Sequence, residues 1–162
     1  FDSLPPDIGR VMSVGRLDIN TEGLLLLTND GGLARYLEHP STGWARTYRA
    51  RAFGILDLKN LARLKKGITV DGVIYQPIDV RAEKPDKAGG EVPTNHWLTI
   101  TLREGKNREV RKAMEAVGLQ VNRLIRTSYG PFQLGKMERG SVEVVSGKVL
   151  SGSLPKNWRY KI

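Results

Sequence analysis

The sequence contains no cysteine, which excludes a disulfide framework and any metal site built from thiolates. Its two histidines, His39 and His96, lie far apart and form no recognisable spacing of metal ligands. No apolar run approaches the roughly 20 residues that a membrane-spanning helix requires. The first ten residues lack the basic and then apolar order of a signal peptide. We therefore expect a cytoplasmic protein that holds no metal and does not enter a membrane.

Several nucleotide-binding and hydrolytic motifs are also absent. The sequence has no GxxxxGKS/T phosphate loop, no GxGxxG dinucleotide fingerprint, no GxSxG nucleophile elbow and no HExxH zinc motif. These absences argue against an ATPase, a dehydrogenase, a serine hydrolase and a zinc protease. We accordingly expect no nucleotide cofactor and no other cofactor.

The balance of charge is strongly basic. Lysine and arginine number 26 against 17 aspartates and glutamates, which gives a formal net charge of +9. Such an excess is typical of a protein that binds a polyanion such as nucleic acid. At 162 residues the chain is long enough for one sizeable core but too short for two full independent domains.

Short apolar and alternating segments predict a fold dominated by strands. We expect strands at 11–14, 24–28, 46–54, 96–104, 121–134 and 141–150, and two more within 68–83 that meet at a DG turn. The run LLLLT at 24–28 is predicted to be buried on both faces, because it is short and apolar. In RTYRARAFG, Tyr48 alternates with Arg49 and Arg51, so one face of this strand is predicted to be basic.

Three helices are predicted beside these strands. The first follows Asp30 as its N-cap, the second runs over 57–66, and the third runs over 107–117 with Asn107 as its N-cap. The segment 84–95 has the charge, glycine and proline content of a loop. Together these elements predict an α+β fold, with a mixed and mainly antiparallel sheet and a few flanking helices.

Asp18 lies in a loop, residues 15–23, between two predicted strands. An aspartate at such a place is most often a turn or capping residue, and the NTEG that follows is rich in turn formers. Two features favour a reactive carboxylate instead. Arg16 stands two positions before Asp18, and strands at both ends of the loop give it the rigid mounting that a reactive group needs. The residues alone leave both interpretations open.

The stretch 103–126 is rich in basic residues. These are Arg103, Lys106, Arg108, Arg111, Lys112, Arg123 and Arg126. A solvated helix face is one explanation, and a surface that contacts phosphates is the other, which the net charge of the chain favours. The role of Tyr48 is left open in the same way. Most tyrosines in strands serve packing, with the hydroxyl bonded to a partner.

Three longer segments resemble the motifs of a known family. GRLDINTEGLLLLTNDG at 15–31 resembles the catalytic motif of pseudouridine synthases, in the group that contains RsuA, RluB, RluE and RluF. RTYRARAFG at 46–54 is similar to the family's next motif, in which a basic residue stands two positions before a tyrosine. EGKNREVRKAMEAVGLQVNRLIRTSYGPFQLG at 104–135 resembles its third motif, in a form closer to RluB than to RsuA. The three motifs occur in order and extend over most of the chain.

The resemblance implies roles for particular residues. Asp18 would be the catalytic carboxylate, and Tyr48 the ring that packs against the target base and a candidate for handling its proton. Arg111 would be the basic partner of Asp18; a phosphate contact remains the alternative, since its neighbour Lys112 can play either part. Arg16 would enter the RNA stack where the target nucleotide leaves it. The residues expected to bind RNA are Arg16, Arg46, Lys106, Arg108, Lys112, Arg123 and Arg126.

The resemblance also implies an activity. The protein would extrude a uridine of ribosomal RNA, expected to be 23S RNA, and isomerise it to pseudouridine without a cofactor. The leucines at 24–27 would form a dry floor under the catalytic pocket, where electrostatic contacts are stronger. Two other functions remain open, a non-catalytic module that binds rRNA in ribosome assembly and a glycosylase that releases the base.

The same group implies a domain organisation. Its members usually have a small N-terminal RNA-binding domain of the S4 type, followed by a strand with a KP-G motif, and neither is found in this sequence. Residues 1–162 are therefore expected to be the catalytic domain, incomplete at its N-terminus. We expect this unit to be a monomer.

Overall fold

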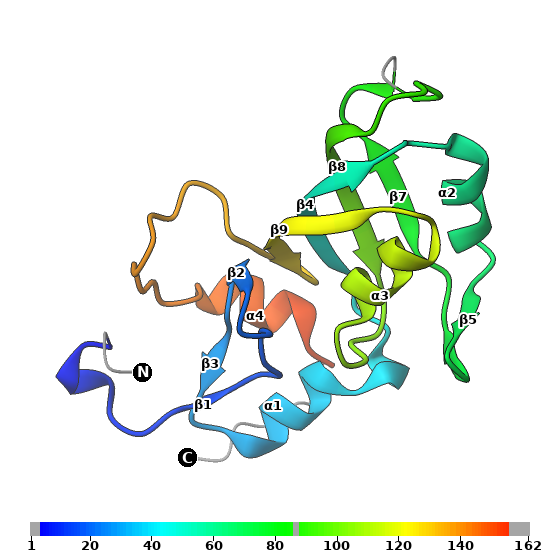
Figure 1. Cartoon of the computed structure of the whole chain (residues 1–162). Helices are drawn as coiled ribbons and strands as arrows, with labels where there is room; N and C mark the ends of the chain where they lie inside the picture. The colour runs from blue at the N-terminus through cyan, green and yellow to red at the C-terminus, as the bar shows by residue number, and fades with distance from the viewer. Residues whose placement is uncertain (1–3, 86–87, 156–162) are drawn as a thin grey trace.

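The computed structural model of the chain describes residues 4–85 and 88–155, and its centre is a six-stranded sheet (Figure 1). The sheet has the order β10-β9-β4-β8-β7, and β2 pairs with β9 away from this path. Its strands are β2 (Thr21–Gly23), β4 (Arg46–Gly54), β7 (Asp79–Ala82), β8 (Thr94–Leu102), β9 (Gln120–Tyr129) and β10 (Phe132–Gln133). Within the described residues the pairs are antiparallel, except for β2 with β9. The expected α+β fold with a mainly antiparallel sheet is confirmed.

Two small sheets and several helices accompany this central sheet. The small sheets are β1 (Met12–Ser13) with β3 (Leu27–Thr28), and β5 (Ile68–Val70) with β6 (Val73–Tyr75). The α-helices are α1 (Gly31–Glu38), α2 (Leu58–Leu64), α3 (Glu109–Ala116) and α4 (Gly147–Ser153). Short 3-10 helices lie at Pro6–Ile8 and Pro40–Thr42. In the part of the chain that the structure describes, no helix has the length and apolar character needed to cross a membrane.

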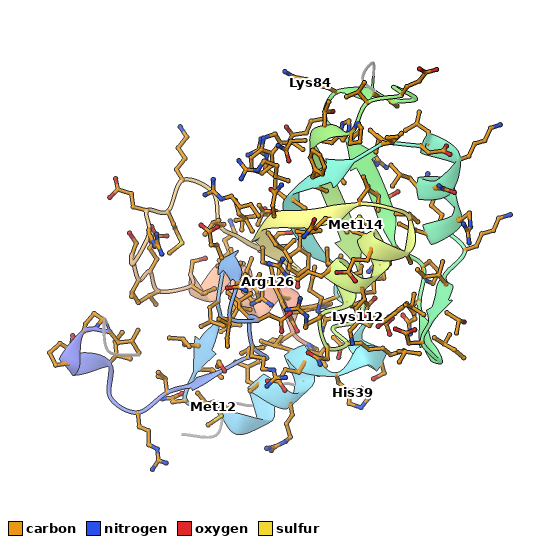
Figure 2. The ribbon with its side chains drawn as sticks, in the orientation of Figure 1. Met12, His39, Lys84, Lys112, Met114 and Arg126 are labelled. Carbon is orange, nitrogen blue, oxygen red and sulfur yellow. The ribbon has the colours of Figure 1, made fainter. Side chains whose placement is uncertain are left out.

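Alternation along β4 and β8 separates the two faces of the sheet, because successive side chains of a strand point to opposite sides. Ala50 and Ala52 of β4, and Leu98 and Ile100 of β8, are fully buried on one face. Helices α2 and α3 cover this face and share one hydrophobic cluster with these residues. Met114 of α3 belongs to the same cluster (Figure 2). We call this side the covered face of the sheet.

The opposite side, here called the open face, carries partly exposed polar and aromatic side chains. The guanidinium carbons of Arg49 and Arg51 lie 3.8 and 5.8 Å from the ring centroid of Trp97 on β8. Arg49 Nε also lies 2.6 Å from Glu83 Oε1, and Arg51 Nε donates to Asn122 Oδ1 at 2.6 Å. The basic face predicted for β4 is confirmed, and its cations have partners.

A second hydrophobic cluster lies beside the sheet. In it α1, Val14 just after β1 and the leucine run pack against Tyr129 and Phe132. Helix α1 begins as predicted, because Asp30 Oδ1 accepts hydrogen bonds from the N–H groups of Gly32 and Leu33. Figure 1 shows α1, β1 and β3 together on one side of the central sheet.

The leucine run differs from its prediction. Leu24 and Leu26 are buried in the second cluster, Leu25 is 39% exposed, and strand β3 covers only Leu27–Thr28. The prediction of a strand over 24–28, buried on both faces, is wrong because the second cluster packs against one side of the run only.

The start of α3 also differs from its prediction. The helix begins at Glu109, and its N-cap is Arg108 in the left-handed conformation, with φ of 51°, rather than Asn107. Glu109 Oε1 accepts a hydrogen bond from the N–H of Lys106 at 3.1 Å. The turn before α3 is therefore held by the side chain of Glu109, the first residue of the helix, instead of by the expected Asn107 cap.

The segment 141–150 is not a strand. Residues 141–146 have no regular structure, and Gly147–Ser153 form α4, whose Val149 N–H donates to Ser146 Oγ at 3.2 Å. Val144 is 96% exposed. The apolar alternation predicted a strand, but a strand needs a partner to satisfy its main chain, and none of the described strands pairs with this segment.

Candidate active site

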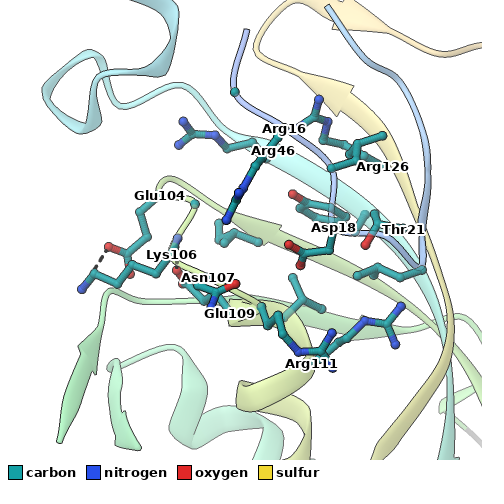
Figure 3. A pocket seen from close by; sticks show the side chains of 18 of the residues that line it. Arg16, Asp18, Thr21, Arg46, Glu104, Lys106, Asn107, Glu109, Arg111 and Arg126 are labelled. Atoms are coloured by element: carbon teal, nitrogen blue, oxygen red, sulfur yellow. Dashed lines mark hydrogen bonds and ion pairs between the residues drawn. The ribbon is translucent and has the colours of Figure 1, made fainter. Parts of the chain in front are cut away.

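A pocket of about 390 Å³ opens between the Asp18 loop (residues 15–20), the covered face of β4 and β9, and the segment 104–111 (Figure 3). Asp18, Tyr48 and Arg111 all line it. Figure 3 shows the Asp18 carboxylate pointing into this space. Three residues that come from three separate sequence motifs thus meet at a single cavity.

Hydrogen bonds hold the Asp18 loop in place. At its start, the Gly15 N–H donates to Glu38 Oε1 of α1 at 2.5 Å. Inside the loop, the Thr21 N–H donates to the Asp18 carbonyl at 2.9 Å and closes a turn. At its end, β2 pairs in parallel with β9. The turn uses the main chain of Asp18 and leaves its carboxylate to the pocket, so the two interpretations of this residue are compatible.

Gly23 is required where the loop meets β9. Its φ is 110°, and a Cβ at this position would collide with the main chain of Arg126. Only glycine combines this backbone conformation with such a close approach of two chains. The glycine therefore fixes how near the Asp18 loop lies to the sheet.

Tyr48 lies on the covered face of β4, opposite Arg126 of β9. Burial raises the pKa of the Tyr48 hydroxyl above its ordinary value of 10.0. The nearby charges of Arg126 and Arg46 lower this pKa, and the charge of Asp18 raises it. The hydroxyl is therefore within electrostatic range of the carboxylate and of two buried cations.

The side chain of Arg111 binds a main-chain carbonyl of the Asp18 loop. Its Nη2 donates to the carbonyl of Asn20 at 2.8 Å, and its Nη1 donates to the carbonyl of Val121 at 3.2 Å. The ion pairs among the described residues do not include Asp18 with Arg111. Burial and the charge of Arg108 lower the pKa of Arg111, whereas the charge of Asp18 raises it. Arg111 thus holds the loop and lies close enough to interact with the carboxylate.

The residues expected to bind RNA divide into two sets. Those that line the pocket are Arg16, Arg46, Lys106, Arg108 and Arg126. Lys112 and Arg123 do not line it, and Arg123 Nε lies 3.1 Å from Glu22 Oε2 on the exposed surface. Arg46 and Arg126 are only 6% and 3% exposed. These two arginines belong to the interior of the protein, unlike the other three.

Two acidic residues that the sequence analysis did not single out, Glu104 and Glu109, also line the pocket and are 5% and 3% exposed. Glu104 Oε1 accepts the N–H of Gln76 at 2.7 Å. Burial, and then the charge of Glu104, raise the pKa of Glu109 to about 7. In the sequence these glutamates look like ordinary partners of the surrounding cations, so only their burial identifies them. In the described part of the chain, no cluster of three or more His, Asp or Glu residues is placed to hold a metal ion.

Tyr129 is a further pocket residue that the sequence analysis did not single out. Its hydroxyl accepts a hydrogen bond from Arg46 Nη2 at 2.9 Å and donates to the carbonyl of Leu37 at 2.7 Å. The guanidinium carbons of Arg46 and Arg126 lie 4.9 and 5.1 Å from the centroid of its ring. Tyr129 therefore supports both buried arginines. In the sequence, its position within the third motif, residues 104–135, is the feature that could have identified it as a site residue.

The expected dry floor of leucines is absent from the pocket lining. None of the leucines at 24–27 lines the pocket, whose apolar surface includes Leu17, Leu102, Val110 and Leu124. The expectation is wrong because residues 24 and 26 turn toward the second hydrophobic cluster.

Comparison with known proteins places the chain in a family. The model of the family described as RNA pseudouridylate synthase matches residues 4–116. The chain belongs to this family. The match includes Asp18, Tyr48 and Arg111, which line the pocket. The resemblance to pseudouridine synthases is confirmed.

Curated pseudouridine synthases are similar to this chain along most of its length. The ribosomal large subunit pseudouridine synthase B of Pasteurella multocida is 50% identical over 146 residues, which cover 88% of this chain and 40% of that protein. An uncharacterized RNA pseudouridine synthase of Rickettsia conorii is 43% identical over 144 residues, which cover 89% of this chain and 60% of that protein. The chain thus spans 40% and 60% of the length of these two relatives.

Solved structures share the pseudouridine synthase fold. The crystal structure of a pseudouridylate synthase superposes with a TM-score of 0.80 at 24% identity, covering 94% of this chain and 64% of that one. A chain of an H/ACA RNP bound to a substrate RNA containing 2'-deoxyuridine superposes with a TM-score of 0.55 at 15% identity, covering 76% of this chain and 40% of that one. At these identities the comparison establishes the fold alone.

Proposed function

We propose that this member of the pseudouridylate synthase family isomerises a uridine of large-subunit (23S) ribosomal RNA to pseudouridine in the cytoplasm, with Asp18 as the catalytic carboxylate. The observation that carries the proposal is the meeting of Asp18, Tyr48 and Arg111 at one pocket. The choice of RNA rests on relatives named ribosomal large subunit pseudouridine synthase B. The net charge of +9 supports a partner rich in phosphates.

The reaction breaks the glycosidic bond between C1′ and N1, turns the uracil, and joins C1′ to C5. The C5 proton then leaves, and N1 takes a proton from water, so the product is an isomer of the substrate. Asp18 can act as a nucleophile on the sugar, as carboxylates do in covalent glycosyl chemistry. It can also act as a base that starts an elimination. Either route needs the carboxylate form of Asp18.

The target uridine must leave its stack before it can enter the pocket, at a cost of a few kcal/mol. Arg16 is exposed at the edge of the pocket and is suited to fill the gap in the RNA. The ring of Tyr48 would stack on the extruded uracil. The exposed Lys106 and Arg108 would contact phosphates.

Release of tritium from C5-labelled uridine in 23S rRNA transcripts tests the activity. We expect Asp18→Asn to lower release by about 10²- to 10⁴-fold or more, the range for a lost acid or base, without a comparable loss of RNA binding. Asp71→Asn is the matched control, because Asp71 is exposed in the β5–β6 turn and does not line the pocket. Equal release by wild type and Asp18→Asn would refute the catalytic role, and preference for 16S transcripts would refute the choice of RNA.

The same assay separates the other two functions. RNA binding with no tritium release by the wild-type chain would indicate a non-catalytic module. Free uracil with an abasic site in the RNA would indicate a glycosylase. A pseudouridine product, identified by nucleoside analysis of the treated RNA, is the result that we expect.

A further inference from the structure

Arg126 differs from the exposed cations expected to bind RNA. It is 3% exposed, whereas Arg16, Lys106 and Arg108 at the same pocket are exposed. A contact to the RNA backbone needs a guanidinium that reaches the RNA surface. The depth of Arg126 favours a role inside the site over a phosphate contact.

Arg126 is tied to Leu24, which follows β2, the strand that continues the Asp18 loop. Its Nε donates to the carbonyl of Leu24 at 2.9 Å, and its own carbonyl accepts the N–H of Leu24 at 2.8 Å. These two bonds fix Leu24, the residue that follows β2. The preceding Gly23 lies so close to β9 that only glycine fits there. Figure 2 shows Arg126 at this junction of β2 and β9. A change in this side chain would therefore be felt in the loop that carries Asp18.

Arg126 also lies directly opposite Tyr48, and an irregularity in the sheet puts it there. Thr47 pairs with Ser128, but Tyr48 pairs with Arg126, so Thr127 is the extra residue of a β-bulge. Without the bulge Tyr48 would face Thr127. Opposed residues on one face of an antiparallel pair have Cβ atoms about 4.5–5.5 Å apart, and bulges commonly re-aim side chains next to active sites.

The guanidinium of Arg126 keeps a buried nitrogen, Nη2, without a hydrogen-bond partner among the described residues. The Tyr129 ring lies 5.1 Å away and holds the group in place. A buried donor without a partner is costly, so this atom is suited to an acceptor that forms during the reaction.

We propose that Arg126 is a positioning residue that stabilises Tyr48 as a phenolate and holds the Asp18 loop beside it, so that Tyr48 can accept the C5 proton. This inference rests on the proposed function. After C1′ has joined C5, C5 is tetrahedral and the ring holds a C6=N1 double bond. The phenolate oxygen takes the C5 proton, the electron pair of that C–H bond forms the C5=C6 bond, and the π pair of C6=N1 moves to N1. N1 takes a proton from water, and the Tyr48 hydroxyl returns its proton to solvent.

Burial has the largest effect on Tyr48 and raises its pKa, which disfavours the phenolate. Of the nearby charges, Arg126 lowers this pKa most, Arg46 lowers it further, and Asp18 raises it. Arg126 is therefore the side chain that does most to offset the cost of a buried phenolate. The other charged residues that line the same cavity are Arg16, Glu38, Glu104, Lys106, Arg108, Glu109 and Arg111.

The first test does not depend on catalytic turnover. The protein has five tyrosines, so the phenolate absorbance of each variant is titrated with and without the additional change Tyr48→Phe, and the difference isolates Tyr48. We expect Arg126→Gln to raise the Tyr48 pKa and Arg126→Lys to raise it less. The control Arg81→Gln removes the same charge from an exposed position on β7 and should leave this titration unchanged. An unchanged Tyr48 titration in Arg126→Gln would overturn the proposal, whether or not the enzyme is active.

The second test is the pH dependence of tritium release. If Tyr48 acts as a phenolate, turnover rises with pH, and each unit by which its pKa increases lowers turnover at neutral pH about tenfold. We expect Arg126→Gln to move the rising limb to higher pH, with little change in KM for RNA, and Arg126→Lys to restore part of the rate. Equal losses of kcat and of RNA affinity with an unmoved limb would make Arg126 a phosphate contact. If Arg126→Gln does not fold, Arg126→Lys carries both tests, since it keeps the charge but loses the bond to Leu24.

Discussion

The arginines on the two faces of strand β4 differ in their burial and in their hydrogen-bond acceptors. On the open face, Arg49 and Arg51 are half-buried, stack on Trp97, and have acceptors in Glu83 and Asn122. On the covered face, Arg46 and the neighbouring Arg126 are buried, and each keeps a guanidinium nitrogen without an acceptor among the described residues. In the sequence all of these are basic residues of strands. The difference teaches that burial without a hydrogen-bond acceptor, rather than charge alone, distinguishes the side of the sheet that carries the candidate site.

Loss of the Tyr48 hydroxyl is expected to give the largest effect on the covered face. Tyr48→Phe keeps the ring that packs in the pocket and removes the group proposed to accept the proton. We expect tritium release to fall about 10²- to 10⁴-fold, the range for a lost general base, with thermal stability close to wild type. Normal release by Tyr48→Phe would limit this residue to stacking.

Arg111→Met is expected to have the next largest effect. The change removes the bonds to Asn20 and Val121 and a cation near Asp18. We expect turnover to fall about 10²-fold, as for the loss of one stabilising donor, and RNA affinity to fall much less. A filter-binding assay run beside the kinetics checks this; a parallel loss of both quantities would make Arg111 a phosphate contact.

Glu109 gives a prediction about stability rather than turnover. Its pKa is raised from 4.5 to about 7, so the stability linked to its neutral form is present below pH 4.5 and is lost as the pH rises through 7. We expect Glu109→Gln to be more stable than wild type at pH 8 and closer to wild type at pH 4.

Urea unfolding at the two pH values measures this difference. Glu115→Gln on the exposed side of α3 is the matched control, and it should follow wild type at both. Parallel pH dependence of wild type and Glu109→Gln would contradict the prediction. It would show that Glu109 titrates as an ordinary surface glutamate despite its burial.

The smallest effect is expected on the open face. Arg49→Gln breaks the ion pair with Glu83 and the stack on Trp97, but both partners of the ion pair are partly exposed, with 42% and 35% of their side chains accessible. We expect a loss of less than about 1 kcal/mol in the free energy of unfolding and normal tritium release. A large loss of activity would remove the contrast between the two faces.

Much of the fold could be predicted because it depends on local patterns. The alternation of RTYRARAFG predicted β4 with its correct limits and faces. Asp30 and Asp57 predicted the starts of α1 and α2, since their side chains cap the first free N–H groups. The strand predicted at 141–150 was wrong, because a segment with strand alternation does not form a strand when no described strand pairs with it.

The candidate site was predictable in part. The three motifs brought Asp18, Tyr48 and Arg111 together on the basis of resemblance, and all three line one pocket. The buried glutamates and Tyr129 were not predicted, because their burial depends on how segments distant in the chain pack. Lys112 and Arg123 stay outside the pocket because helix and strand geometry turn them away from it.

The sequence by itself determined the strand alternation of β4, the helix starts, the basic character and the family motifs, because each depends on residues near one another in the chain. Only the tertiary structure decided that Arg126 faces Tyr48 and clamps Leu24, a residue 102 positions away. A single bulged residue sets that pairing, and one shift in register changes which side chain lies opposite. Local patterns cannot specify such a register, since it results from the packing of the Asp18 loop, β4 and β9 against one another.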